Sequence, residues 1–221
     1  MNSISIAFDL SQSSMTGTSK ITLPPGDSLT LFSGDLEITG LLLEIEDSAP
    51  LTLYPSNQNT IRVPESSSVQ TVFVSWKFTA QGRGDNLISD SGITLAGLWH
   101  PLPDKDMVYR LEARLPDGFT AISEGEELTY CLDRFNNRYL TTVFDHPVRS
   151  IHFAAGPYTV RSRTVSDNIT LSAYFFKEDL SLVDEYLDKA EYYLEMYQEM
   201  IGPYPYTRYS IVENRLPTGY G

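Results

Sequence analysis

The chain has 221 residues, a formal net charge of −13 and 41% hydrophobic residues, which argues against wholesale disorder and for a packed core. The negative charge would repel a phosphate backbone, so we expect no nucleic-acid partner. Cys131 is the only cysteine, which excludes an intrachain disulfide and a thiolate metal cluster. No apolar run reaches the roughly 18 residues that span a bilayer, so we expect no membrane segment in this chain.

Short strands are predicted over residues 1–175. Ile4, Ile6 and Phe8 alternate with smaller or polar residues, as they must in a strand with one buried face. Val72, Val74 and Trp76 repeat this period of two. Turn signals such as the Pro-Pro-Gly-Asp segment at 24–27 recur about every 8–12 residues, which is typical of an antiparallel sandwich or an open antiparallel sheet. The predicted fold class is therefore mainly β.

The period changes after residue 176. Apolar residues recur at spacings of three and four, which predicts one stripe on a helix of about six turns. Asp179 or Ser181 can begin the helix, and Gly202 suits its end. A last strand is predicted at 209–213. We expect two domains, 1–175 and 176–221. The helical stripe consists of Val183, Tyr186, Leu187, Ala190, Tyr193, Leu194, Tyr197 and Ile201.

The three histidines, His100, His146 and His152, form no HExxH pair, so we expect neither catalytic nor metal-binding residues in this chain. His146 and His152 lie six residues apart. A metal pair there stays open, but structural histidines are the interpretation that we favour.

Three acidic residues close in sequence, Glu124, Glu126 and Glu127, admit two interpretations. Paired carboxylates can perform acid–base chemistry. Because Gly125 lies among them, we favour an exposed turn.

Several segments, taken in order, resemble zinc peptidases of the aminopeptidase N and leukotriene hydrolase family (gluzincins). Phe8-Asp9-Leu10 with a turn at Gly17 is similar to that family's opening strands, and Trp99-His100-Pro101 and Ala155-Gly156-Pro157-Tyr158 are similar to later stretches. The most specific part is the long helix, the Gly-Pro-Tyr-Pro-Tyr segment at 202–206 and the strand after it. The resemblance covers nearly the whole chain.

This resemblance implies a saddle-like N-terminal β-sandwich domain in residues 1–175. It also implies that 176–221 opens an α+β, thermolysin-like catalytic domain. The family hydrolyses peptide bonds with zinc held by an HExxH helix. We expect the chain to be truncated before that helix, so that zinc is a cofactor of the full-length protein only. Gly219, Tyr220 and Gly221 would lie near a substrate-binding strand. The partners implied are the missing catalytic domain and a peptide.

The sequence departs from the family pattern where aminopeptidases place acids that hold a free amine. Asp90 is the nearest acid in residues 86–98, and Pro103-Asp104-Lys105-Asp106 stands in place of a D-E-P element. Exopeptidase, endopeptidase and inactive relative therefore stay open, as do bacterial cytoplasm and periplasm or cell envelope.

A stand-alone β-sandwich that binds carbohydrate or protein is the alternative. If the catalytic domain is missing, the helical stripe should expose an apolar patch or cause self-association.

Overall fold

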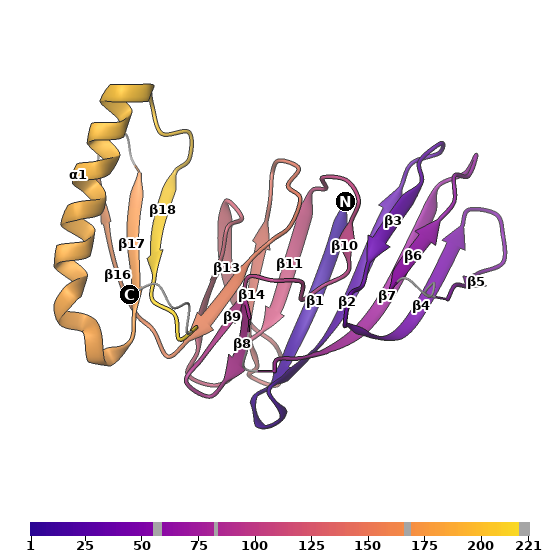
Figure 1. The fold of residues 1–221 in the computed structure, drawn as a ribbon, viewed down its shortest axis with the longest axis horizontal. Helices are drawn as coiled ribbons and strands as arrows, with labels where there is room; N and C mark the ends of the chain where they lie inside the picture. The colour runs from indigo at the N-terminus through magenta and orange to yellow at the C-terminus, as the bar shows by residue number, and fades with distance from the viewer. Residues whose placement is uncertain (55–58, 82–83, 166–168, 217–221) are drawn as a thin grey trace.

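A computed structural model describes residues 1–54, 59–81, 84–165 and 169–216. The chain is mainly β, with several antiparallel sheets and one long helix near the C-terminus, which confirms the predicted class (Figure 1). Within these ranges, no helix is both long enough and apolar enough to cross a bilayer.

The largest sheet orders eight strands as β13-β14-β11-β1-β2-β7-β4-β5. Its neighbours are antiparallel except for β1 and β11, which run parallel although they are far apart in the sequence. The bounds are β1 (Asn2–Asp9), β2 (Ser14–Leu23), β4 (Glu37–Ile45), β5 (Leu51–Thr52), β7 (Gln70–Thr79), β11 (Tyr109–Arg114), β13 (Glu127–Leu132) and β14 (Arg138–Val143).

Two smaller sheets share one hydrophobic core with the large sheet. Buried tryptophans join them: the Trp76 indole donates to the carbonyl of Trp99, and the Trp99 indole donates to that of Ile151, both at 3.0 Å. The three-stranded sheet is β10 (Leu102–Pro103), β3 (Leu29–Phe32) and β6 (Thr60–Val63); the four-stranded sheet is β12 (Thr120–Ser123), β15 (Phe153–Gly156), β9 (Gly92–Leu95) and β8 (Asn86–Ser89). We call these three sheets the β region.

The turn expected at Gly17 is wrong, because Gly17 lies within β2. The chain reverses earlier, in a short 3₁₀ helix at Leu10–Gln12 that is followed by Ser13 with φ of 48°. Gly17 is opposite Trp76, and a Cβ atom at Gly17 would lie 2.3 Å from the indole ring. The glycine therefore provides space for a buried tryptophan and does not form a bend.

The C-terminal unit is built on a fourth sheet, ordered β16-β17-β18, with its own hydrophobic core beneath the helix α1. Its elements are β16 (Thr159–Thr164), β17 (Thr170–Phe175), a 3₁₀ helix (Lys177–Leu182), α1 (Val183–Ile201) and β18 (Arg208–Val212). β17 and β18 are parallel and α1 connects them. The expected domain boundary at residue 175 falls between β17 and α1; the two-domain division stays a prediction.

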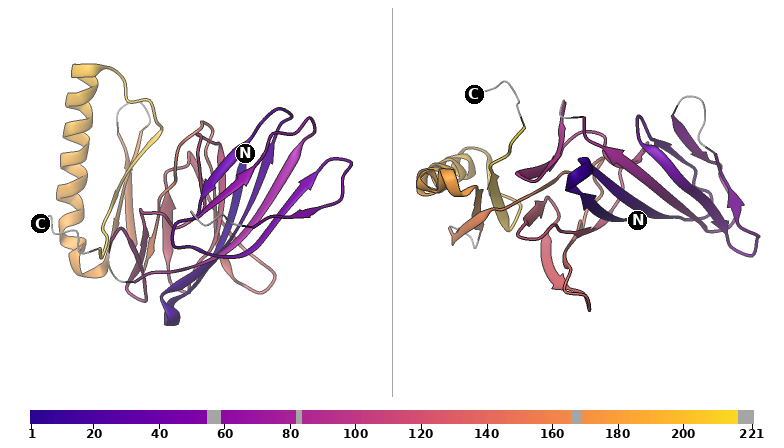
Figure 2. Two further views of the ribbon diagram at one scale, coloured as in Figure 1. Left: turned by 45° about the vertical axis from the view of Figure 1, so that its right-hand side comes forward. Right: turned by 90° about the horizontal axis from the view of Figure 1, so that it is seen from below.

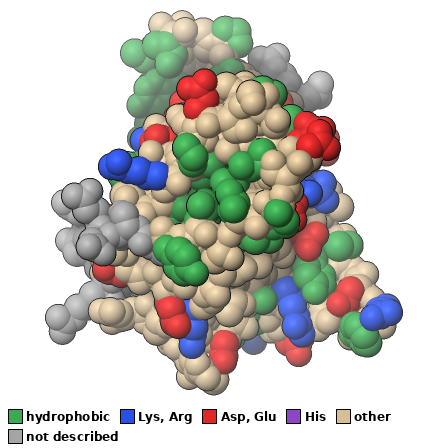
Figure 3. Space-filling view, turned by 90° about the vertical axis from the view of Figure 1, so that its right-hand side faces the viewer, with side chains coloured by type: hydrophobic (Ala, Val, Ile, Leu, Met, Phe, Trp, Pro, Cys, Tyr) green, Lys and Arg blue, Asp and Glu red, His purple; other side chains and the backbone are tan. Residues whose placement is uncertain are grey.

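The two faces of β17 serve different cores. Leu171, Ala173 and Phe175 pack against α1, whereas Tyr174 packs toward the β region. Consistent with this, α1 lies on the side of its sheet that faces away from the β region (Figures 1 and 2). Figure 3 views the opposite end of the molecule, where hydrophobic side chains gather at the centre and charged ones surround them.

Only part of the predicted helical stripe is covered. Val183, Leu187 and Leu194 are buried in the core that α1 shares with β17, whereas Tyr193 and Ile201, the last residue of the helix, are exposed. The expected caps at Asp179 and Ser181 are absent, since the 3₁₀ helix precedes α1 and no side chain caps it. Gly202, with φ of 112°, ends the helix as predicted.

Candidate functional site

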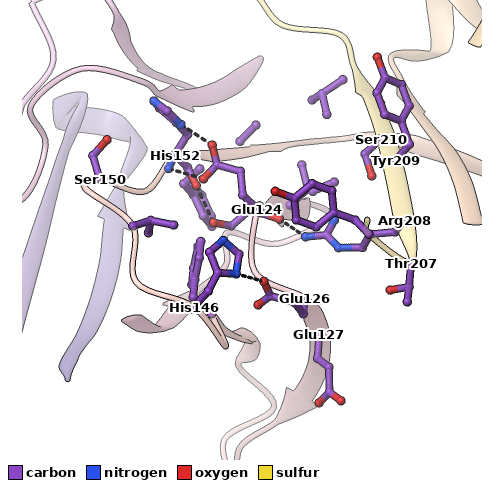
Figure 4. Close-up of a pocket in the computed structure, with 18 of the residues that line it drawn as sticks. Glu124, Glu126, Glu127, His146, Ser150, His152, Thr207, Arg208, Tyr209 and Ser210 are labelled. Carbon is purple, nitrogen blue, oxygen red and sulfur yellow. Dashed lines mark hydrogen bonds and ion pairs between the residues drawn. The ribbon is translucent and has the colours of Figure 1, made fainter. Parts of the chain in front are cut away.

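A cavity of about 1000 Å³ lies between the β region and the C-terminal unit (Figure 4). Its walls come from β9, β12, β15 and β18, from the turn between β12 and β13, and from the loops that precede β15 and β18. Residues that are as far apart in the sequence as Thr94 and Val212 line the same space. The cavity is thus created by the docking of the two parts.

Arg208, the first residue of β18, connects the two parts at the edge of this cavity. Its guanidinium donates to the carbonyl oxygen of Ser123 at 2.5 Å, and its Nε donates to that of Gly125 at 3.1 Å. A Cβ atom at Gly125 would lie 2.8 Å from the carbonyl oxygen of Val143, so this tight turn requires glycine. The turn and the arginine together fix one wall.

A first carboxylate–imidazole pair joins Glu124 to His152. The Glu124 carboxylate accepts from the His152 backbone N–H at 2.8 Å and also contacts Nδ1 of the ring. The hydrogen bond that the His152 ring donates to the Glu124 carboxylate raises the pKa of His152 above its ordinary value. Burial opposes ionisation of Glu124, but its bonds with His152 hold the pKa of this carboxyl below its usual range.

Glu126 and His146 lie beside this first pair in Figure 4, and together with Asp145 they form a second group. Nδ1 of His146 lies 2.9 Å from a carboxylate oxygen of each acid, and the Asp145 N–H donates to Glu126 at 2.9 Å. The hydrogen bond that the His146 ring donates to the Asp145 carboxylate is the main reason that the pKa of His146 is raised. One imidazole N–H thus faces two carboxylates.

These three residues are the ones that could hold a divalent cation. Their ligand atoms lie within 4.8 Å of one another, and no other such group occurs in the part of the chain that the structure describes. Carboxylate oxygens and an imidazole nitrogen suit zinc and related ions. Asp145 and His146 are exposed, which is equally typical of a surface hydrogen-bond cluster.

Tyrosines form the wall that the C-terminal unit contributes. The ring of Tyr204 lies 5.4 Å from that of Tyr206 and 6.2 Å from that of Tyr209, in edge-to-face contacts. Tyr206 also lies 6.4 Å from the ring of His146, across the cavity. The cavity therefore combines an aromatic wall with an acidic, imidazole-rich wall.

Only some of the residues that the sequence analysis singled out lie at the cavity. Gly219, Tyr220 and Gly221 lie outside the described residues. His100 is buried between Trp99 and Tyr109, and burial lowers its pKa to about 4, so it is a structural histidine. His146 and His152 both line the cavity, but they contact different acids: His152 contacts Glu124, and His146 contacts Glu126 and Asp145.

The turn predicted at 124–127 is present, but the sequence analysis did not find that its glutamates contact histidines. Glu124 and Glu126 each bind a histidine about 20–30 positions later in the chain. Neither spacing follows a helical or strand period, so no local sequence signal could have revealed the pairs. The Glu124–His152 pair depends on β12 lying beside β15, whereas Glu126 meets His146 because β13 lies beside β14.

Comparison with protein-family models and with curated proteins finds no match to this chain. The resemblance to zinc peptidases accordingly depends on the residues quoted for it.

Proposed function

We propose that this chain is the non-catalytic front region of a zinc-dependent peptidase of the aminopeptidase N type. In this proposal the β region is the saddle-like, sandwich-type N-terminal domain. The C-terminal unit is the beginning of the catalytic domain, and the cavity between them is one wall of the peptide cleft.

The observation that carries the proposal is the edge strand of the C-terminal sheet, β18. β18 has a strand partner on only one side among the described residues, and that strand lines the cavity. A parallel β-α-β unit whose last strand is an edge strand can be extended by a further strand on that side. The family places such a sheet next to its substrate.

In this proposal the catalytic zinc is held by an HExxH helix that is not among these residues, and not by the group of Glu126, Asp145 and His146, which lacks that pattern. The sequence contains no HExxH pattern. His100 is buried and packs against Trp99 and Tyr109. In the full-length protein, the zinc would polarise the peptide carbonyl and activate a water molecule. This chain would shape and position the substrate.

Expression of the longer product of the same reading frame tests the proposal. We expect an HExxH motif after Gly221, about one zinc ion per chain by metal analysis, and peptide hydrolysis that a chelator abolishes. The 221-residue chain alone should hydrolyse no peptide. A reading frame without HExxH, or hydrolysis by the 221-residue chain, would contradict the proposal.

The tyrosine wall favours a second candidate, a module that binds carbohydrate or protein in the cavity. Ligand sites are commonly aromatic with a few polar groups, as this cavity is. Binding of a glycan by the 221-residue chain, lost on Tyr206→Ala but retained on Tyr54→Ala, would support this candidate. Tyr54 is a suitable control because it is 81% exposed and does not line the cavity.

A further inference from the structure

The cavity between the β region and the C-terminal unit has an excess of negative charge. The described residues that line it carry four carboxylates, one guanidinium and two imidazoles. Even with both imidazoles protonated, the carboxylates outnumber the cations. The guanidinium belongs to Arg208, whose donors are directed at the carbonyl oxygens of Ser123 and Gly125 and not at a carboxylate. A cleft lined mainly by one sign of charge attracts ligands of the opposite sign.

Two of these carboxylates, those of Glu126 and Asp145, keep room for a further donor. A carboxylate has about four lone-pair sites. Glu126 contacts His146 through one oxygen and the Asp145 N–H through the other, and Asp145 contacts His146 through one oxygen. The Asp145 side chain is 75% exposed, so a ligand can reach it without disturbing a core. A cationic ligand therefore finds acceptors at this wall.

The opposite wall presents an aromatic ring. The ring of Tyr206 is 6.4 Å from that of His146, which contacts both carboxylates, and the Tyr206 side chain is 50% exposed. Tyr204 holds this ring by an edge-to-face contact at 5.4 Å. The face of a tyrosine ring attracts a cation within about 6 Å of its centroid. A cation in this gap can therefore meet carboxylates on one side and a ring on the other.

We infer that the cavity binds the guanidinium of an arginine side chain in a peptide, between the carboxylates of Glu126 and Asp145 and the ring of Tyr206. A guanidinium is planar: its N–H groups pair with carboxylates while its face stacks on an aromatic ring, whereas an ammonium offers only a point charge. The cavity, at about 1000 Å³, is at the upper end of the range for ligand sites, so it also has space for the neighbouring residues of the peptide. This inference rests on the proposed function, because it takes the cavity as part of the peptide cleft.

Calorimetric titration of the 221-residue chain with two blocked tripeptides tests the inference. The first is acetyl-Ala-Arg-Ala-amide, and the second carries citrulline in place of arginine, which keeps the shape of the side chain but is neutral. A chelator in the buffer keeps metal ions away from the carboxylates. We expect the arginine peptide to bind at least ~10-fold more tightly, because only it supplies a charged donor and a cation for the ring. Equal affinities, or no binding of the arginine peptide at millimolar concentration, overturn the inference.

Variants of the two walls assign the site. Glu126→Gln and Asp145→Asn remove a charge but keep the shape, and each should weaken binding of the arginine peptide and leave the citrulline peptide unaffected. Tyr206→Leu should weaken binding of the arginine peptide, whereas Tyr206→Phe, which keeps the ring, should not. Asp117→Asn is the matched control, because Asp117 is exposed and does not line the cavity. An equal effect of the Asp117 and Asp145 variants would reduce the preference to net charge and overturn the inference.

The longer product of the reading frame separates this inference from the proposed function. Zinc-dependent hydrolysis that does not distinguish arginine from citrulline peptides overturns the arginine site and leaves the proposed function standing. Tight binding of the arginine peptide by a protein whose reading frame contains no HExxH motif does the reverse.

Discussion

Trp76 determines which residue the neighbouring strand can carry. Its ring lies against the backbone of Gly17, and its indole N–H donates a hydrogen bond to the Trp99 carbonyl. The side chain is 1% exposed and therefore has little room to move. The packing of one buried aromatic residue thus explains a glycine that looks like a turn in the sequence.

Gly17→Ala should lower the free energy of unfolding by about 1–3 kcal/mol, the usual cost of overpacking a core. Its Cβ would overlap the Trp76 ring at 2.3 Å. Urea unfolding followed by tryptophan fluorescence measures the change. Gly40→Ala is the matched control, because this glycine also lies in a strand and its Cβ would be 3.4 Å from Ser75. Equal losses in the two variants would contradict the role of Trp76.

β18 is the element that joins the two parts of the molecule. Ile211 faces the core under α1, whereas Val212 packs with Tyr158 and Phe176 against Ile122 of the β region. Beyond its end, Glu213 accepts from the Phe176 N–H and, through its carbonyl, from the Tyr158 hydroxyl, both at 2.7 Å. A single strand thereby contributes to two cores and to the cavity.

Arg208→Ala should loosen this junction without unfolding either core. The carbonyls of Ser123 and Gly125 would lose a charged donor, and such bonds contribute about 1.5–3 kcal/mol each. We expect faster amide hydrogen exchange in the turn at 123–127 and in β18. Arg62→Ala provides the comparison, since Arg62 is exposed on β6. Unchanged exchange rates in the Arg208 variant would show that the apolar contacts alone hold the junction.

The molecule has two main cores with a smaller apolar cluster between them. The larger core lies within the β region, and the second is enclosed by β17, α1 and β18. Because the second core takes residues from both sides of position 176, a cut there divides it. A cut before Tyr158 removes it whole.

Deletion of 177–221 should therefore cause self-association or local unfolding, since Leu171 and Phe175 would lose their cover. Deletion of 158–221 should leave a monomer that unfolds cooperatively. Size-exclusion chromatography and thermal unfolding distinguish the two products. A monomeric, fully folded chain after deletion of 177–221 would mean that the β16–β17 hairpin does not need α1.

The sequence by itself determined the features that depend on local periodicity. Alternation predicted the strands around Ile4 and Val72, spacings of three and four predicted the helix, and Gly202 predicted its end. These features follow from backbone geometry, which repeats every two or 3.6 residues. Only the tertiary structure decided that Gly17 lies under Trp76, that Glu124 meets His152, and that Val183, Leu187 and Leu194 are the buried part of the helical stripe. Each of these depends on which strands lie side by side, and pairing between distant strands leaves no periodic mark in the sequence.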